Sequence, residues 1–403
     1  MSARDPRIAI IGGGIGGLTL AIALRQRGIA ADAYEQVPHL AEIGAAVALS
    51  ANSTRELRRL GVLDQVTAAS CEPTELIYRD WRTGDRVAAH PVRNSYQARF
   101  GAPYYGIHRA DLQRALSGAL GGAGLHLGYR LSGLQDQGGT MRLDFDNGHV
   151  AEADLVVGAD GVRSMVRQWV TEGEGVAYSG TSALRGIVPT AGLPSLPDPQ
   201  AIQFWMGPDA HLLHYAIGGD GQDVNYFAVM EGPREWHAAG SVTEMDQDEA
   251  RAAFTGWHPA VTEMVAAVPH HKRWGLFVVR PLLRWHRGRA VLLGDSAHAM
   301  VPHHGQGANT TIEDAITLAE LLAHVEPDGM DGMMARYQGL RRARTRKIQR
   351  SSWATNGVLH LPDGPDLAAR DRKMARFPQD FAWIHEFDAL QSARQAARTA
   401  AHA

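Results

Sequence analysis

A glycine-rich turn near the N-terminus carries the clearest chemical signal in this chain. Gly12, Gly14 and Gly17 follow the spacing Gly-x-Gly-x-x-Gly, between an apolar run and a segment of helical periodicity. The first glycine permits a tight turn, the second a close backbone approach to a pyrophosphate, and the third close helix–strand packing. Glu35 follows Gly17 by 18 residues, where a carboxylate can accept hydrogen bonds from ribose hydroxyls. The pattern predicts a dinucleotide site whose ribose carries no 2′-phosphate.

Two later segments join glycine to aspartate. Residues 158–164 read Gly-Ala-Asp-Gly-Val-Arg-Ser, and residues 294–298 read Gly-Asp-Ser-Ala-His. The second segment continues through Pro302 to Gln306–Asn309 and then to Glu313-Asp314-Ala315. Between the glycine turn and these segments lies His108-Arg109-Ala110-Asp111-Leu112.

With the glycine turn, these segments make the chain resemble the group A flavoprotein aromatic hydroxylases over nearly its whole length. Residues 360–365, together with Trp383 and Asp388, resemble the branch of salicylate hydroxylase and 6-hydroxynicotinate 3-monooxygenase. The resemblance implies FAD as the cofactor. The residues it implies for FAD binding are Gly12, Gly14, Ile15, Gly16, Gly17, Glu35, Gln36, Val47, Arg109, Asp160, Gly161, Asp295, Pro302, Gln306, Gly307, Ala308 and Asn309.

These roles also make physical sense residue by residue. Asp295 should end a strand at the mouth of a parallel sheet, where ligands of open α/β sheets bind. Gly307 should open a helix, whose N–H groups and dipole can face the electron-rich edge of a reduced flavin. Two plainer interpretations remain: Asp295 is a cap or turn residue, and Asp160 is a turn residue of the Asx type.

The redox partner follows from what the sequence lacks. It has no second Gly-x-Gly-x-x-Gly, and its single cysteine, Cys71, excludes a Cys-x-x-Cys redox pair. Flavoprotein disulfide reductases normally show both features. We therefore expect NAD(P)H to bind only transiently, as a co-substrate.

The resemblance implies an enzyme, an FAD-dependent monooxygenase that consumes NAD(P)H and O2. It would hydroxylate a small aromatic or heteroaromatic substrate, of the phenol or hydroxy-aromatic acid type, through a C4a-hydroperoxyflavin, with or without decarboxylation. One alternative is a monooxygenase or epoxidase that acts on a larger natural-product scaffold. A second is an FAD-binding dehydrogenase or another flavoprotein that does not oxygenate.

Three residues are candidates for catalysis. The resemblance implies His211 and Tyr215 as substrate-pocket residues, and strand alternation places both on one face of residues 211–217. They would lie about 13 Å apart in an ideal strand, so we expect Tyr215 in the pocket and His211 at its edge. His303 should line the reaction cavity and share the proton of a phenol, with a pKa near the operating pH. We interpret His304 as a surface loop residue.

One position departs from the family pattern. The segment Gly44–Asn52 has Ala48 where the family usually carries a polar side chain beside the flavin. The 6-hydroxynicotinate enzyme has a histidine at that place. Ala48 therefore argues against that particular substrate and predicts a roomier or more apolar pocket.

Hydrophobic periodicity gives the elements that must position these residues. We expect a βαβ unit from a strand over 7–11, a helix over 18–27 and a strand over 31–34, and a second helix over 52–60. Residues 140–145 and 149–157 should pair as a hairpin around a type I′ Asn147-Gly148 turn. Further strands are predicted over 183–189, 201–206, 211–217, 225–230, 275–279 and 290–293, and a helix over about 308–325.

The predicted fold class is α/β: a Rossmann-like FAD-binding domain with an inserted antiparallel β-sheet substrate domain and a C-terminal helical segment, as in the p-hydroxybenzoate hydroxylase-like fold. The FAD domain is expected over 1–72, 100–178 and 281–335, the substrate domain over 73–99 and 179–280, and the helical segment over 336–403.

Composition narrows the partners. The 403 residues carry a formal net charge of −3, which gives no global field to attract nucleic acid. No apolar run approaches the ~18 residues of a membrane span, so we expect a cytoplasmic protein without a membrane partner. We expect a monomer or homodimer, and no nucleic-acid partner. Cys71 should be a small buried hydrophobe, and no metal site is expected. We interpret the basic stretch from Arg336 to Arg350 as a solvated helix face rather than an attractor of NAD(P)H or an anionic substrate.

Overall fold

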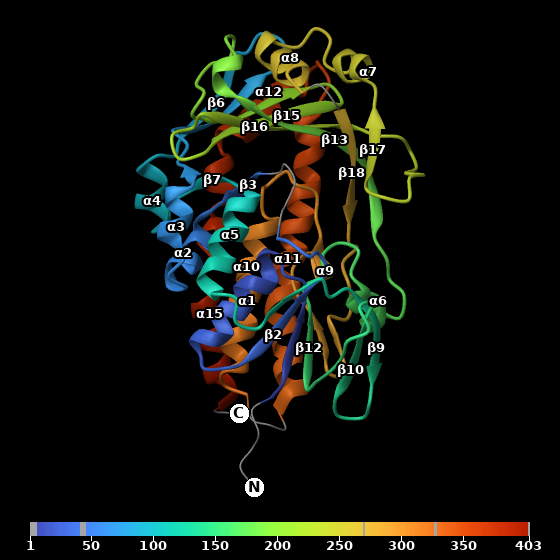
Figure 1. Cartoon of the computed structure of the whole chain (residues 1–403). Coiled ribbons are helices and arrows are strands. Elements are labelled where there is room, and N and C mark those ends of the chain that lie inside the picture. Colours follow the sequence, from blue (N-terminus) through green and yellow to red (C-terminus); the bar gives the residue numbers. More distant parts are fainter. Residues whose placement is uncertain (1–5, 41–45, 269–270, 326–328, 402–403) are drawn as a thin grey trace.

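The computed structural model describes residues 6–40, 46–268, 271–325 and 329–401. The first two residues of the Gly44–Asn52 segment, Gly44 and Ala45, lie outside these ranges. Figure 1 shows an upper sheet and a lower sheet, with the long helix α11 (Met330–Leu359) running between them. The predicted α/β fold class is confirmed.

The lower sheet has six strands and contains the predicted βαβ unit. Its order is β19 (His286–Arg287), β20 (Ala290–Leu292), β12 (Leu155–Gly158), β1 (Ile8–Ile11), β2 (Ala31–Glu35) and β8 (Leu125–Leu127). All neighbours pair in parallel except β19 and β20. Every residue of β1 is buried, as the apolar run requires of a central parallel strand. Helix α1 (Ile15–Gln26) begins at Ile15 rather than at the predicted Leu18, so Gly16 and Gly17 belong to its first turn.

There are also two small three-stranded sheets, and one of them corrects a prediction. They are β9 (Leu131–Asp136), β10 (Met141–Phe145) and β11 (Val150–Ala153), and β3 (Ala46–Leu49), β7 (Tyr105–His108) and β4 (Ser70–Cys71). The predicted strand over 149–157 is wrong as one strand, since β11 pairs with β10 while β12 joins the lower sheet. The type I′ turn is also wrong. Gly148 has φ +83° and Asn147 is not among the residues of positive φ, which fits a three-residue loop ending in a left-handed glycine.

The upper sheet has eight strands. Its order is β17 (Val242–Met245), β18 (His271–Val278), β13 (Ala177–Pro189), β16 (Asp223–Glu231), β15 (Ala210–Ile217), β14 (Ile202–Gly207), β5 (Glu75–Asp80) and β6 (Arg86–Pro91). Pairing is antiparallel except between β14 and β5, which run parallel. This one junction departs from the predicted all-antiparallel sheet, because β5 enters from a distant part of the chain.

Helices enclose the sheets and join them. Those of the first half are α2 (Ala51–Arg59), α3 (Leu63–Ala68), α4 (Ser95–Phe100), α5 (Arg109–Leu120) and α6 (Met165–Thr171), followed by a short 3-10 turn, η1 (Thr190–Gly192). Those of the second half, besides α11, are α7 (Gln247–Ala252), α8 (Pro259–Ala266), α9 (Asp295–His298), α10 (Gly307–Leu322), α12 (Leu367–Ala375), α13 (Phe377–Asp380), α14 (Ala382–His385) and α15 (Ala389–Ala401). Helix α10 packs against α1, α2, α11 and α15, so the residues at its start are held from several sides.

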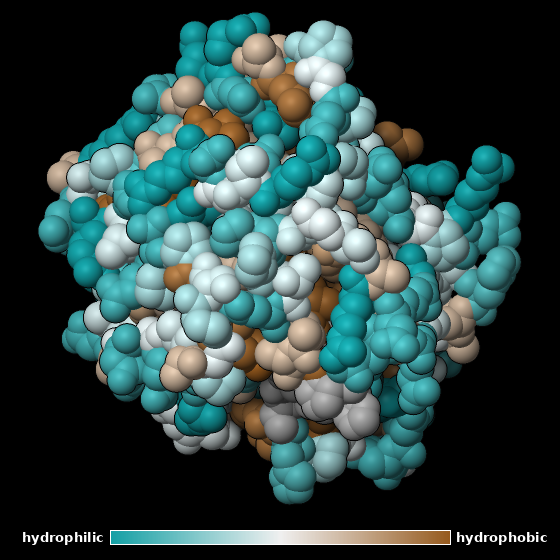
Figure 2. Space-filling view, turned by 90° about the horizontal axis from the view of Figure 1, so that it is seen from above, coloured by the Kyte–Doolittle hydropathy of each residue, from teal (hydrophilic) through white to brown (hydrophobic). Residues whose placement is uncertain are grey.

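The two faces of the upper sheet are buried differently. Helices α7 and α8 cover the outer face over a core that includes Trp205, Leu212 and Phe254. The inner face carries Leu213 and Tyr215, which confirms the predicted alternation along β15. From above, the molecule is mainly hydrophilic, with apolar side chains in small separate groups (Figure 2). Within the described ranges, no helix is both long and apolar enough to cross a bilayer.

Candidate active site

The glycine turn joins β1 to α1 and leaves room at one of its glycines. Gly12 has φ +113°, and a Cβ there would lie 2.3 Å from the carbonyl oxygen of Ala159. A Cβ on Gly17 would lie 1.9 Å from the carbonyl oxygen of Gly12, so both positions exclude any side chain. A Cβ on Gly14 would meet nothing within 4 Å. This open space beside the first N–H groups of α1 fits a pyrophosphate, which those groups can bind.

Glu35 braces the same turn. Its Oε2 accepts a hydrogen bond of 2.7 Å from the backbone N–H of Gly13, and its Oε1 accepts one of 3.0 Å from Val37. The half-buried carboxylate keeps lone pairs for ribose hydroxyls, and Gln36 beside it is exposed. Buried Gln113 of α5 donates to the carbonyl of Gly13 at 3.1 Å. The turn is thus held from two sides.

Asp160 has a structural role that the sequence left open. Its Oδ2 accepts hydrogen bonds from the N–H groups of Met165 and Val166, at 2.8 and 3.1 Å, which caps the start of α6. Its Oδ1 accepts one of 3.1 Å from the Ser296 hydroxyl, while Gly161 takes φ +75°. Burial raises the pKa of this carboxyl. The Asp160 side chain therefore acts as a helix cap that ties α6 to α9, rather than forming an Asx turn with the residue two positions on.

Asp295 is placed differently. It opens α9, and Leu293 and Gly294 separate it from the end of β20. Its Oδ1 would lie 4.0 Å from a Cβ built on Gly307 at the start of α10. Within the described ranges, no hydrogen bond or ion pair reaches its carboxylate. An unpaired acceptor between a strand end and a helix N-terminus suits a ligand hydroxyl.

We expect Asp295→Ala to weaken FAD retention. Loss of a hydrogen bond to a charged group costs about 1.5–3 kcal/mol, so FAD affinity should fall about 10- to 100-fold. The flavin-to-protein ratio after purification and a fluorescence titration of the apoprotein measure it. Asp331→Ala, at an exposed aspartate of α11, is the matched control. A fully yellow Asp295→Ala protein with unchanged affinity would contradict the role.

The other residues expected at FAD come from several elements. Ile15 is buried as the first residue of α1, and a Cβ on Gly16 would lie 2.5 Å from the Thr311 side chain of α10. Val47 pairs with Ile107 in the sheet of β3 and β7. Arg109 begins α5, and Pro302 is half-buried directly before His303.

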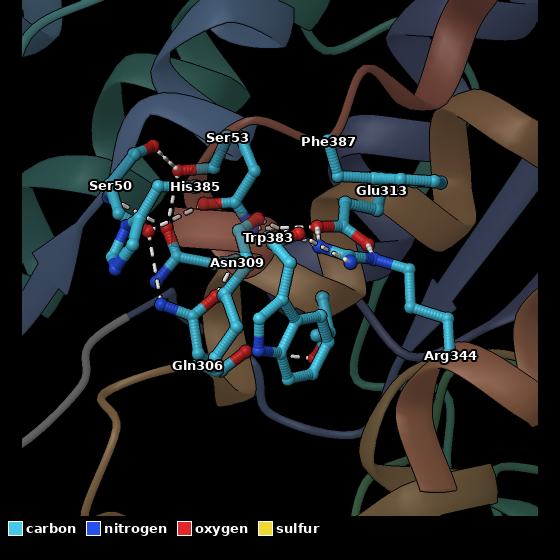
Figure 3. Close-up of polar contacts among 12 residues, drawn as sticks. Ser50, Ser53, Gln306, Asn309, Glu313, Arg344, Trp383, His385 and Phe387 are labelled. Carbon is cyan, nitrogen blue, oxygen red and sulfur yellow. Dashed lines mark hydrogen bonds and ion pairs between the residues drawn. The ribbon is translucent and has the colours of Figure 1, made fainter. Parts of the chain in front are cut away.

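Side chains at the start of α10 bind the chain around Ser50 (Figure 3). Asn309 accepts from the Ser50 N–H at 2.9 Å and the Ser53 hydroxyl at 2.5 Å, and donates to the carbonyls of Ala48 and Gly305. Gln306 donates to the Ser50 hydroxyl at 3.0 Å. Because both side-chain amides are already hydrogen-bonded within the protein, only the backbone N–H groups of residues 307–309 are available to a flavin.

A buried ion-pair network lies one turn further along α10. Arg341 donates to Asp314 and to Glu313 at 2.6 Å each. Arg344 adds two bonds of 2.7 Å to Glu313 (Figure 3). His298 Nε2 lies 2.5 Å from Asp314 Oδ2. Burial alone would raise the pKa values of both carboxyls, but their charged partners outweigh it and hold them below the usual range.

This network corrects the interpretation of the basic stretch. Arg341 is 0% exposed and Arg344 nearly buried, so the predicted solvated face is wrong for these two residues. Arg346 and Arg350 of the same helix are exposed. Because of the helical period, the arginines of one run lie on both buried and exposed faces of the helix. The arginines that are buried are those that face the carboxylates of α10.

A cavity of about 280 Å³ lies between the upper sheet and the start of α10. Its walls are mainly aromatic and apolar, and they include Ala48, Tyr215 and His303. A volume near the lower end for ligand pockets suits a single ring. Sequence reasoning missed the lining residues Tyr96, Tyr104, Arg99, His304, Phe377 and His385. His304 lies within the 294–309 segment and was assigned to the surface, whereas the others come from short segments without a motif, so no local signal could have identified them.

His303 is 2% exposed, and neither ring nitrogen has a hydrogen-bond partner within the described ranges. An unpaired buried polar group costs about 1–3 kcal/mol, which a bound ligand would recover. Burial, followed by the fields of His360 and His304, lowers the pKa of His303 to about 3. The predicted pKa near the operating pH is wrong, because the surrounding apolar walls disfavour the imidazolium. A neutral imidazole with a free acceptor nitrogen remains.

His304 is not a surface loop residue. It lines the cavity, lies 2.9 Å from the Ser351 hydroxyl of α11, and packs on the Phe381 ring. Burial lowers its pKa to about 4. The surface prediction is wrong because α11 and α13 fold over this loop.

His211 and Tyr215 separate as the strand geometry indicates. Tyr215 lines the cavity, and burial raises the pKa of its phenol, so the hydroxyl stays protonated. His211 is not among the lining residues, and its Nδ1 lies 2.7 Å from His360 Nε2. The His211 and His303 rings meet edge to face, with centroids 5.2 Å apart. His303 therefore lies between the cavity and His211.

The chain is similar to known proteins in sequence and in fold. Residues 5–352 match the family model described as FAD binding domain. The chain is 37% identical to a 3-amino-4-hydroxybenzoate 2-monooxygenase of Streptomyces cremeus, over 95% of each chain. It is 33% identical to a 6-hydroxynicotinate 3-monooxygenase of Bordetella bronchiseptica, over 90% of this chain and 94% of the relative. Among solved structures, a substrate complex of salicylate hydroxylase superposes with a TM-score of 0.85 at 26% identity, over 98% of both chains.

Proposed function

The chain belongs to the FAD-binding-domain family and is an FAD-dependent aromatic monooxygenase of the salicylate hydroxylase group, and from this premise we propose that it hydroxylates a single-ring hydroxy-aromatic or hydroxy-heteroaromatic acid with NAD(P)H and O2 as co-substrates. The observation that carries the proposal is the cavity of about 280 Å³ beside His303. The larger natural-product scaffold of the alternative needs more room than this.

The charges around the cavity support an acid. Among the described lining residues there is no aspartate, glutamate or lysine, and Arg99 is the one arginine. Arg99 lies exposed on α4 beside the Phe100 ring, without an ion pair to a described residue. A guanidinium at the rim of an apolar cavity suits the carboxylate of a ring acid. The names of the relatives, a hydroxybenzoate and a hydroxynicotinate enzyme, agree with such a substrate.

Each lining group has a distinct task in this proposal. Bound FAD supplies the transfer of electrons from NAD(P)H and the activation of O2. The apolar walls exclude water, and Arg99 orients the ring through its carboxylate. Neutral His303 accepts the hydrogen bond of the substrate hydroxyl and takes its proton, which raises the electron density of the ring. Protonated Tyr215 donates a hydrogen bond to a substrate oxygen.

The test is a panel of single-ring hydroxy-acids, each paired with the same ring lacking the carboxylate. We expect an acid to stimulate NAD(P)H oxidation and O2 uptake and to gain one oxygen atom by mass, with CO2 loss scored separately. Arg99→Gln should raise KM for that acid about tenfold, which corresponds to the lower end of the free energy of a hydrogen bond to a charged group. KM for the same ring without the carboxylate should not change. Arg372→Gln, exposed on α12 away from the cavity, is the control. Stimulation only by multi-ring compounds would refute the proposal.

A further inference from the structure

A chain of buried imidazoles leads from the cavity to the surface of the upper sheet. His211 of β15 is 1% exposed, and its Nδ1 lies 2.7 Å from Nε2 of His360. The Nδ1 of His360 lies 3.1 Å from Oε1 of Glu231, whose side chain is 51% exposed. The cavity end of the chain is His303, edge to face with His211. Both nitrogens of the His360 ring are therefore in use, one toward the interior and one toward solvent.

The backbone holds the outer end of this chain in place. His360 is the C-cap residue of α11, and its carbonyl oxygen accepts a hydrogen bond of 3.2 Å from the N–H of Asp209. The Asp209 carbonyl in turn accepts one of 3.0 Å from the N–H of Glu231. Asp209 has φ +57° in the tight turn between β14 and β15. One strained turn thus fixes both His360 and Glu231.

The proposed chemistry needs such a path. A phenolic proton released in the cavity meets no carboxylate among the described lining residues. His303 can take it, but an imidazolium there is disfavoured by the apolar walls. The charge must therefore move on before the next turnover. A neutral imidazole can pass a proton by accepting one at one nitrogen and releasing one from the other.

We propose that His303, His211, His360 and Glu231 form a relay that carries the substrate's hydroxyl proton from the inner end of the cavity to solvent. The O–H bond of the substrate breaks and an N–H bond forms on His303, which passes a proton to His211. His211 passes one from its Nδ1 side to His360, and His360 passes one to Glu231, which releases it to water. A rotation of the His303 ring or one water closes its gap to His211. The relay rests on the proposed substrate class.

The electrostatic surroundings of each member are defined. His211 faces His360 and His303, and His303 faces His360 and His304. His360 faces Glu231 and Asp209, whose charges oppose the lowering of its pKa by burial. Burial lowers the pKa of all three rings, which disfavours the charged form of each.

The experiment follows proton release directly. A nitro-substituted hydroxybenzoate, whose phenolate absorbs visible light, is mixed with the oxidised holoenzyme in a stopped-flow instrument without NAD(P)H. In His360→Gln, ionisation of the bound probe should slow about 10²-fold, the lower end for a positioned proton-transfer group, with its Kd unchanged. Glu231→Gln keeps the hydrogen bond but cannot take a proton. It should slow ionisation in the same direction, and added imidazole buffer should restore the rate.

The controls separate the relay from a structural role. Glu235→Gln removes the same charge from an exposed glutamate (79% exposed) and should leave the rate and its buffer dependence unchanged. Wild-type rates in both His360→Gln and Glu231→Gln, with the probe bound, would overturn the relay. A wild-type holoenzyme that fails to bind the probe speaks instead against the substrate class. In that case, nitrogen NMR of the histidines tests the relay. Glu231→Gln should change the tautomer signals of both His360 and His211. An unchanged His211 signal would overturn the relay.

Discussion

Arg341→Leu should destabilise the protein by about 3–5 kcal/mol, because removal of one member of a buried ion-pair network leaves uncompensated charge. Arg341 is fully buried and donates to both Glu313 and Asp314 at 2.6 Å. Leucine fills much of the volume of the arginine side chain but makes none of its hydrogen bonds. Arg344 still neutralises Glu313, whereas Asp314 keeps, among the described residues, His298 and the backbone N–H of Gly294. Urea unfolding of the holoenzyme followed by circular dichroism measures the loss.

The matched control for this prediction is Arg346→Leu. It removes the same charge from an exposed position of the same helix and should change stability by no more than about 0.5 kcal/mol. An equal loss of stability in the two variants would show that the buried network contributes no more to stability than one exposed positive charge does. Because α10 starts at the candidate flavin site, partial loss of FAD from Arg341→Leu is expected as well.

His303→Ala should lower kcat by about 10²–10⁴-fold while FAD stays bound, since a positioned proton acceptor contributes that much. The side chain is the member of the histidine chain that lines the cavity. Its pKa of about 3 leaves the ring neutral, so its own titration should not shape the activity profile between about pH 5 and 9. Steady-state turnover, with the flavin-to-protein ratio measured on the same sample, checks the prediction.

The acidity of the substrate separates proton transfer from packing. If His303 takes the hydroxyl proton, ring substituents that make the phenol more acidic, or a higher pH, should restore much of the rate of His303→Ala. A defect that stays the same for all phenols and all pH values would place His303 in the packing of the cavity instead. Unchanged turnover would remove it from the mechanism.

Features that follow short-range rules could be predicted from the sequence. Gly12 must take a positive φ, and Gly17 must lack a Cβ because a carbonyl lies against it, so the turn between β1 and α1 was predictable. The alternation of Leu212 and Leu213 across β15 followed from the two-residue period of a strand. These features depend on neighbours in the chain, and local sterics and periodicity decide them.

Tertiary structure decided what depends on distant partners. Nothing local marks Arg341 as buried, since the carboxylates that bind it lie on another helix, 27 and 28 residues away. His211 and His360 are separated by 149 residues, and His304 became a cavity residue only because α11 and α13 cover it. The pKa of His303 was likewise misjudged, because desolvation is a property of the surrounding walls. Burial, pairing and pKa arise from three-dimensional packing, which no short window of sequence contains.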